Sequence, residues 1–305
     1  MKRLRFIVSL ITDDNDYQRQ QAAAAREAAT RLGVDLQTLF ANSDSVQQSR
    51  QLLDAIQSRN GGVDGILVEP ASRTAFPKVA QAAVASGIAW VVLNSDAGYL
   101  RELRAGSTVP AFAVSADNRE IGRIQGRQLA ALLPAGGSVL YIQGPSQSTV
   151  TEQRTAGMLE TKPESISVRI LKSAQWTEEA GFHVVSSWLQ LSMARQEPIH
   201  AVQAQNDDLA MGARRAIEEQ TAGAARNRNS SLPFLGVDGL PRTGQAWVRR
   251  GILTATIITP VLTAHALDML VAAIDRRVQP PERTLIAPTS FPGPSELGAK
   301  LAARR

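Results

Sequence analysis

Short apolar runs rich in β-branched residues alternate with longer amphipathic stretches along nearly the whole chain. Several runs, such as residues 65–68 and 90–93, are continuously apolar, which is typical of strands buried on both faces of a parallel sheet. The stretches between them have helical spacing. This repeat predicts an α/β fold built from doubly wound parallel sheets. The predicted strands are residues 6–11, 36–40, 65–68, 90–93, 111–114, 138–142, 166–171, 201–204, 234–237 and 253–258.

The number of strands predicts two lobes. About ten strands exceed what one doubly wound sheet comfortably holds, so we expect two sheets. The sequence suggests three points where the chain passes from one lobe to the other: after Val114, at Thr259-Pro260, and in the Pro-rich stretch that ends near Pro288. We therefore assign residues 1–114 with 260–288 to an N-terminal lobe and residues 115–259 with 289–305 to a C-terminal lobe. The three crossings would form a hinge, with a ligand cleft between the lobes.

Two helix ends can be placed from local patterns. The Ala-rich stretch of residues 20–32 runs into Gly33, which is a helix-stop signal. The pattern Ser45-x-x-Gln48 predicts a capping box at the start of a second helix.

Composition and charge exclude several classes of protein. The 305 residues include no cysteine, so disulfides, thiolate metal sites and cysteine nucleophiles are excluded. The net charge is +5, but the basic residues are scattered along the chain and aromatic residues make up only 5% of it. We therefore expect no nucleic-acid partner. No apolar stretch reaches the roughly 18 residues of a membrane span. The N-terminus has no signal-peptide pattern, which leaves both a removed signal and a cytosolic location open.

Patterns of catalysis and cofactor binding are missing. The three histidines are isolated and lack metal-site spacing. No glycine loop of a dinucleotide site follows a strand, and no nucleophile elbow is present. The acidic cluster at residues 13–16 lacks the glycine and distal Glu of a calcium loop. We expect a protein without catalytic residues, metal or cofactor; a sugar isomerase or hydrolase using Asp14 and Glu69 is the enzymatic alternative.

Polar and aromatic side chains follow several predicted strands at their carboxyl ends, where open α/β sheets bind ligands. Amides and carboxylates suit hydroxyl groups, and aromatic rings stack on the apolar faces of sugar rings. Helix capping and turn formation are the alternative roles for each of these residues. The residues are Asp13, Asp14, Asn15 and Tyr17 after the first strand, Glu69 after the third, Asn94 after the fourth, and Gln143, Trp176, Asn206, Asp207 and Asp238 in the second lobe.

Four motifs occur in a distinctive order. They are Ser115-Ala-Asp117-Asn118, Arg154-Thr-Ala-Gly157-Met158, Gln205-Asn206-Asp207-Asp208 continuing to Gly212-Ala213, and Gly236-Val-Asp238-Gly239. Together they resemble the periplasmic sugar-binding proteins of ABC transporters, of the ribose- and galactose-binding type. The resemblance covers nearly the whole chain and implies the type I periplasmic binding protein fold. It implies that Arg154, Asn206 and Asp238 bind sugar hydroxyls and that the first motif is a hinge segment.

The resemblance also implies roles for the other candidates. Asp14 and Asn15 stand where the family has its first polar contact, and Tyr17 and Trp176 where it has stacking aromatics. Asn94 and Trp176 are closer to the galactose type. Glu69 replaces the Asn usual in ribose binders, and Thr259 replaces a usual Gln or Asn, so the particular sugar stays open. The implied ligand-binding residues are Asp14, Asn15, Tyr17, Glu69, Asn94, Arg154, Trp176, Asn206, Asp238 and Thr259.

The expected function is a solute-binding protein that captures a monosaccharide or cyclic polyol by hinge closure and delivers it to an ABC importer. We expect a periplasmic monomer whose partners are the sugar and an ABC permease or a membrane sensor. The alternative is a sugar-sensing input domain in a cytosolic or signalling context. LacI-type repressors share the fold but carry a helix-turn-helix before the first strand. Only about five residues precede that strand here, so we do not expect a repressor.

Overall fold

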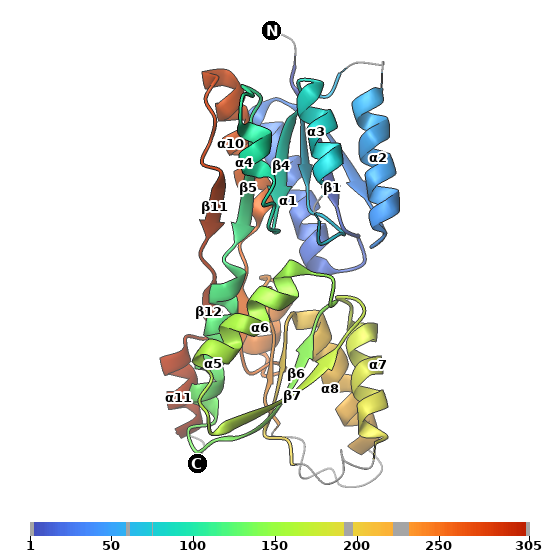
Figure 1. Cartoon of the computed structure of the whole chain (residues 1–305). Helices are drawn as coiled ribbons and strands as arrows, with labels where there is room; N and C mark the ends of the chain where they lie inside the picture. Colours follow the sequence, from blue (N-terminus) through green and yellow to red (C-terminus); the bar gives the residue numbers. More distant parts are fainter. Residues whose placement is uncertain (1–2, 59–61, 75, 192–197, 222–231, 303–305) are drawn as a thin grey trace. The chain divides into compact units, whose positions relative to one another are not determined.

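The computed structural model describes residues 3–58, 62–74, 76–191, 198–221 and 232–302 (Figure 1). The chain forms two compact units, each built from two segments: unit 1 is Met1–Ala116 with Val261–Ile286, and unit 2 is Asp117–Pro260 with Ala287–Arg305. The chain therefore passes between the units after residues 116, 260 and 286. The predicted crossings were after residues 114, 259 and 288.

Unit 1 contains a six-stranded sheet in the order β11-β5-β4-β3-β1-β2, with all neighbouring strands parallel. Its strands are β1 (Arg5–Leu10), β2 (Asp35–Phe40), β3 (Gly65–Val68), β4 (Ala89–Leu93), β5 (Ala111–Ala116) and β11 (Arg283–Ile286). Its helices are α1 (Asp16–Leu32), α2 (Ser45–Gln57), α3 (Pro77–Ala85), α4 (Leu100–Arg104) and α10 (Leu262–Arg276). Helices α1 and α10 cover one face of the sheet, and α2, α3 and α4 cover the other.

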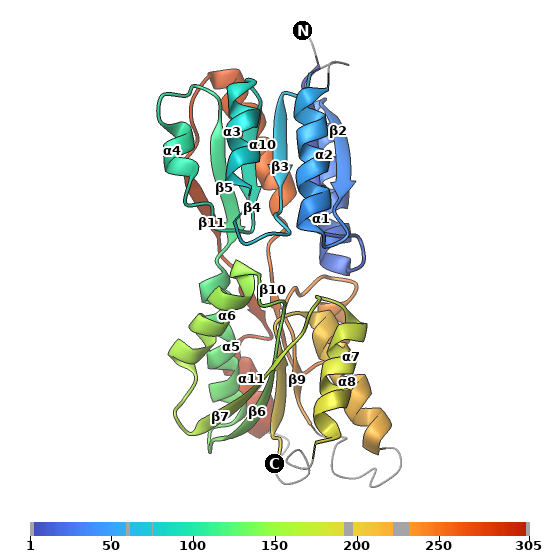
Figure 2. The same cartoon turned by 45° about the vertical axis from the view of Figure 1, so that its right-hand side comes forward.

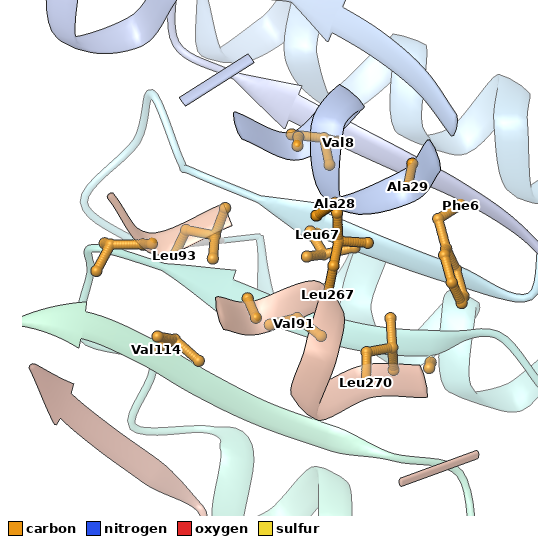
Figure 3. Close-up of a cluster of buried hydrophobic side chains, with 14 of the residues drawn as sticks. Phe6, Val8, Ala28, Ala29, Leu67, Val91, Leu93, Val114, Leu267 and Leu270 are labelled. Carbon is orange, nitrogen blue, oxygen red and sulfur yellow. The ribbon is translucent and has the colours of Figure 1, made fainter. Parts of the chain in front are cut away.

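The core of unit 1 depends on a helix from its second segment. Figure 3 shows Leu267 and Leu270 of α10 among side chains from β1, β3 and β4, with Ala28 of α1 beside them. All these side chains are buried, and Leu267 and Leu270 are fully so. A β-carbon on Gly65 of β3 would lie only 2.9 Å from Leu270 Cδ2. Helix α10 therefore completes the core that β1, β3 and β4 begin.

Unit 2 contains a parallel four-stranded sheet in the order β7-β6-β8-β9 and an antiparallel pair, β10-β12. Its strands are β6 (Gly137–Gln143), β7 (Ile166–Lys172), β8 (Ala201–Ala204), β9 (Phe234–Leu235), β10 (Thr256–Ile258) and β12 (Thr289–Phe291). Its helices are α5 (Asn118–Leu132), α6 (Thr149–Thr161), α7 (Glu178–Leu189), α8 (Asp207–Thr221), α9 (Gly244–Arg249) and α11 (Pro294–Ala302). Figure 2 shows α5, α6 and α11 on one side of the sheet and α7 and α8 on the other. The predicted α/β fold with two parallel sheets is confirmed.

Two helix pairs of unit 2 cross in backbone contact. A β-carbon on Gly122 of α5 would lie 2.1 Å from the carbonyl oxygen of Arg154, and one on Gly157 of α6 would lie 2.0 Å from that of Arg119. Helices α7 and α8 meet in the same way through Gly181 and Gly212. Such distances exclude any side chain, so glycine at these positions sets how closely the helices pack. The α5–α6 contact also fixes the position of Arg154, because its carbonyl oxygen lies against Gly122.

The two predicted helix ends have different outcomes. Helix α1 ends at Gly33, whose φ of 67° is left-handed, and this prediction is confirmed. The capping box at Ser45 is wrong, because Asp44 is the N-cap and its carboxylate accepts hydrogen bonds from the backbone N–H groups of Val46 and Gln47. A carboxylate here also interacts favourably with the helix dipole. Gln48 is buried instead, and its amide donates to the Ser9 hydroxyl and to the carbonyl of Glu69.

Strands β11 and β12 were not predicted. Strand β11 alternates between exposed and half-buried residues at the edge of the sheet. It therefore lacks the continuous apolar run that marks the central strands. Strand β12 has only three residues. Both gain their partners from distant parts of the chain, β5 and β10.

Candidate functional site

The candidate residues of unit 1 gather at the carboxyl ends of β1, β3 and β4. Glu69 follows β3, and Asn94 follows β4 in a left-handed conformation with φ 49°. The Asn94 amide donates to Glu69 Oε1 at 3.1 Å, and the Gln18 amide donates to Glu69 Oε2 at 2.9 Å. All three side chains are buried. The structure brings Glu69 and Asn94 together and adds Gln18, which the sequence analysis did not single out.

The loop between β1 and α1 carries the other candidates of unit 1. Asn15 is the N-cap of α1, and its Oδ1 accepts a hydrogen bond from the Gln18 backbone N–H at 3.0 Å. Its amide also donates to Asp14 Oδ1 at 3.4 Å. Asp14 is exposed, whereas Asn15 and Tyr17 are buried. Asn15 therefore has the capping role that the sequence analysis kept as an alternative, and it places Gln18 next to Glu69. We call Asp14, Asn15, Tyr17, Gln18, Glu69 and Asn94 the unit 1 half-site.

In unit 2, Arg154, Trp176 and Asn206 form one cluster. The Arg154 side chain is buried, and its Nε donates to Asn118 Oδ1 at 3.1 Å while its Nη1 donates to the carbonyl of Gln205. Its guanidinium carbon lies 5.8 Å from the centroid of the Trp176 ring, within cation–π range. Asn206 donates to the carbonyl of Trp176 at 2.8 Å and accepts from the Leu209 backbone N–H at 2.8 Å. Asn206 thus ties Trp176 to the start of α8.

The Trp176 ring packs against Gly144. A β-carbon on Gly144 would lie 2.2 Å from Trp176 Cη2, so the indole packs directly on the backbone after β6. The Gly144 N–H donates to Gln205 Oε1 at 2.9 Å. Gly144 was not predicted, since glycine has no side chain that contacts a sugar, and Gln205 was named only as part of a motif.

Asp238 and Thr259 lie side by side on neighbouring segments. The Asp238 N–H donates to the carbonyl of Ile257 at 2.9 Å, and the Thr259 N–H donates to the carbonyl of Asp238 at 3.0 Å. Asp238 has a left-handed φ of 109°, which is unusual for a residue other than glycine. The Thr259 hydroxyl is buried and has no hydrogen-bond partner among the described residues. We call Arg154, Trp176, Asn206, Asp238 and Thr259 the unit 2 half-site.

Asp207 connects the parts of the unit 2 half-site. Its carboxylate accepts hydrogen bonds from the Gly239 backbone N–H at 2.8 Å and from the Thr256 hydroxyl at 2.7 Å. Burial raises the pKa of Asp207 from its ordinary 3.8 to about 7; the two hydrogen bonds and the charge of Arg154 lower it, and Asp208 raises it. Asp207 was among the polar residues predicted at strand ends, but it was not among the implied ligand-binding residues.

We expect Asp207 to make the protein less stable as pH rises from about 4 to 7. Between these values the folded protein keeps a proton that the unfolded chain has released. Its stabilising contribution is therefore complete below about pH 4 and is lost as pH passes about 7. Urea unfolding of the wild type and of Asp207→Asn across this range measures it. The difference in unfolding free energy between the two should change with pH, and a constant difference would contradict the raised pKa.

Comparison with known proteins places the chain in a family. Residues 6–277 match the family model for the periplasmic binding protein domain. The chain belongs to the periplasmic binding protein family. This confirms the resemblance inferred from the four motifs. Members of this family bind solutes and are not enzymes, which agrees with the missing catalytic patterns. Among the described residues of this periplasmic binding protein, no helix is both long and apolar enough to cross a membrane.

Two curated relatives align over much of the chain. The D-ribose/D-allose-binding protein of Pseudomonas aeruginosa is 30% identical over 199 residues, which are 65% of this chain and 58% of that protein. The ribose import binding protein RbsB of Bacillus subtilis is 26% identical over 252 residues, 82% of this chain and 74% of that one. The chain thus spans less than two thirds of the Pseudomonas relative.

Solved structures share the fold over nearly the full chain. A periplasmic solute binding protein of an ABC transporter from Actinobacillus succinogenes, with bound D-allose, superposes with a TM-score of 0.80 at 25% identity, covering 94% of this chain and 97% of that one. The Caulobacter myo-inositol binding protein gives a TM-score of 0.80 at 22% identity, covering 95% and 93%. These similarities confirm the type I periplasmic binding protein fold.

Proposed function

We propose that this periplasmic binding protein captures a monosaccharide or cyclic polyol in the periplasm and delivers it to an ABC importer. The observation that carries the proposal is the cluster of the buried Arg154 and Asn206 with the half-buried Trp176, which combines a guanidinium, an aromatic face and an amide within one unit. Hydroxyl groups need such donors and acceptors in pairs, and the C–H face of a ring needs the aromatic surface. The relatives named for ribose and allose support the same ligand class.

The proposed mechanism uses both half-sites on one ligand. In the unit 1 half-site, Glu69 accepts hydrogen bonds from ligand hydroxyls and Tyr17 offers a ring, with Asp14, Asn15 and Asn94 as further polar contacts. In the unit 2 half-site, Arg154 donates to the ring or its hydroxyls, Asp238 and Asn206 bind hydroxyls, and Trp176 and Thr259 complete the contact. Closing the units over the ligand at the three chain crossings excludes water. A hydroxyl left unpaired in the closed state is costly, which gives stereochemical specificity.

The ligand test uses freshly purified protein. Native mass spectrometry reveals any retained sugar, and calorimetry then compares D-ribose, D-allose, D-galactose and myo-inositol. We expect one or more of these to bind with a dissociation constant of about 1 μM or tighter. No binding to any of them, and no retained polyhydroxy compound, would contradict the proposal. A ligand recovered in chemically altered form after long incubation would favour the enzymatic alternative instead.

A signalling role is the second candidate. The fructose-binding periplasmic domain of a hybrid two-component system has the same fold, with a TM-score of 0.79 at 23% identity. The ligand half-sites serve either role, so the partner distinguishes them. Co-purification of the sugar-loaded protein with a permease supports transport, and co-purification with a sensor kinase supports signalling. Fractionation of the native host locates the protein.

A further inference from the structure

Asp207 occupies a cradle built from three glycines. A β-carbon on Gly236 would lie 2.1 Å from Asp207 Oδ1, and one on Gly244 would lie 2.0 Å from Oδ2. The third glycine, Gly239, donates its N–H to Oδ2 at 2.8 Å. The Asp207 side chain is nearly inaccessible, with 4% of the residue exposed. The turn of residues 236–244 is thus wrapped around one carboxylate, and two of its glycines are required by that contact.

The same carboxylate joins three parts of unit 2. Asp207 is the first residue of α8, Gly239 belongs to the turn, and Thr256, whose hydroxyl donates to Oδ1 at 2.7 Å, begins β10. Gly239 is further held by Gln245, whose amide donates to the Gly239 carbonyl at 2.7 Å. With φ at 57° and its β-carbon position 2.7 Å from Ile258 Cα, Gly239 also packs against β10. Gly239 is therefore held by α8, by Gln245 and by β10.

Asp238 immediately precedes this anchor. Its backbone is held on both sides by hydrogen bonds to Ile257 and Thr259, in the left-handed conformation with φ 109°. Such a conformation costs about 1–3 kcal/mol and persists only when the surroundings enforce it. The Asp207–Gly239 hydrogen bond is one of the contacts that enforce it, because Gly239 follows Asp238 directly in the chain.

We infer that Asp207 is a positioning residue: its carboxylate holds the 236–244 turn so that Asp238 is presented to the ligand. The inference rests on the proposed function, in which Asp238 binds sugar hydroxyls. Asp207 acts through hydrogen bonds to Gly239 and Thr256 and does not itself contact the sugar. Its role is therefore met by any side chain of the same shape that keeps both hydrogen bonds.

Two substitutions of Asp207 are therefore expected to differ in their effect on sugar binding. Asp207→Asn keeps an oxygen that accepts from the Gly239 N–H, and its amide can donate to the Thr256 hydroxyl, which then acts as the acceptor. Asp207→Ala removes both hydrogen bonds and leaves two buried donors unpaired. We expect Asp207→Ala to weaken binding of the best sugar among D-ribose, D-allose, D-galactose and myo-inositol by at least about 10-fold, and Asp207→Asn by less than about 3-fold. Glu218→Gln, an exposed carboxylate on the same helix, is the matched control and should bind as the wild type does.

A second measurement reports the turn itself. Amide hydrogen exchange at Gly239 should accelerate in Asp207→Ala and stay near wild type in Asp207→Asn, since only the first variant loses the acceptor. Should Asp207→Ala fail to fold, Thr256→Val replaces it, because this change removes one of the two donors and keeps the side-chain shape; an intermediate loss of affinity is then expected.

The outcomes separate this inference from the proposed function. Equal affinity in the wild type and Asp207→Ala, or equal losses in Asp207→Ala and Asp207→Asn, would overturn the positioning role. If the wild type binds no sugar of the panel, the proposed function fails and the presentation of Asp238 to a sugar fails with it, whereas exchange at Gly239 still decides whether Asp207 holds the turn. Unchanged exchange at Gly239 in Asp207→Ala would overturn it in either case.

Discussion

Replacing Asp238 by alanine or by glycine is expected to weaken sugar binding by at least about 100-fold, with the glycine variant the more stable of the two by about 1 kcal/mol. Both changes remove the carboxylate that we propose to bind sugar hydroxyls, and hydrogen bonds to charged groups contribute about 1.5–3 kcal/mol each. The two variants differ in the backbone, since Asp238 has φ 109°. Alanine keeps the strain of this conformation, whereas glycine adopts it without strain. The larger conformational entropy that glycine loses on folding offsets only part of this gain.

Calorimetry with the best sugar and urea unfolding of both variants test this prediction. Arg277→Gly is the matched control, because Arg277 has a left-handed φ of 54° at the exposed end of α10. It should become more stable by a similar amount and keep its affinity. Affinity within about 3-fold of the wild type in either Asp238 variant would remove Asp238 from the site. Equal stability of the alanine and glycine variants would show that the backbone at this position is unstrained.

Gly157→Ala is expected to lower the free energy of unfolding by about 3 kcal/mol or more and to weaken sugar binding as well. The added β-carbon would lie 2.0 Å from the carbonyl oxygen of Arg119, so α5 and α6 must move apart by more than 1 Å to relieve a contact with rigid backbone. Arg154 lies one turn before Gly157 on α6 and moves with it. Its hydrogen bonds to Asn118 and to the Gln205 carbonyl are then strained.

Gly298→Ala controls for the general effect of alanine in a helix. Gly298 lies in α11, and its β-carbon position has its nearest neighbour at 3.7 Å, an ordinary contact. This variant should be as stable as the wild type or more stable by about 0.5–1 kcal/mol, because alanine has the higher helix propensity. Denaturant unfolding of both variants, with calorimetry on the same samples, provides the comparison. Similar stabilities for Gly157→Ala and Gly298→Ala would mean that the α5–α6 contact tolerates a side chain.

The central strands and the strand-end residues were predictable because each depends on local sequence. Strands β3 and β4 are continuous apolar runs, and Glu69 and Asn94 follow them directly, so parallel pairing alone brings these two side chains together. Strand β11 was not predictable, since an exposed edge strand has no apolar run and finds its partner far along the chain.

The supporting roles of Gln18 and Asp207 were missed for a related reason. Gln18 reaches Glu69 across 51 positions, and Asp207 reaches Thr256 across 49. A glutamine in a helix or an aspartate at a helix start carries no sign of such a distant partner. The packing of Gly236 and Gly244 against the Asp207 carboxylate likewise leaves no local sign in the sequence and is visible only in three dimensions.

The division of each unit between two chain segments has a consequence for the order of folding during synthesis. Unit 1 needs α10 to cover β1, β3 and β4, and β11 to pair with β5, yet these elements follow all of residues 117–260. A nascent chain that has emerged only to residue 260 therefore exposes the apolar sheet face that Leu267 and Leu270 later cover. Unit 2 in turn waits for β12 to pair with β10. Each unit is completed only after most of the other has left the ribosome, so the two are finished nearly together, and a chain truncated before residue 286 is a substrate for chaperones and proteases.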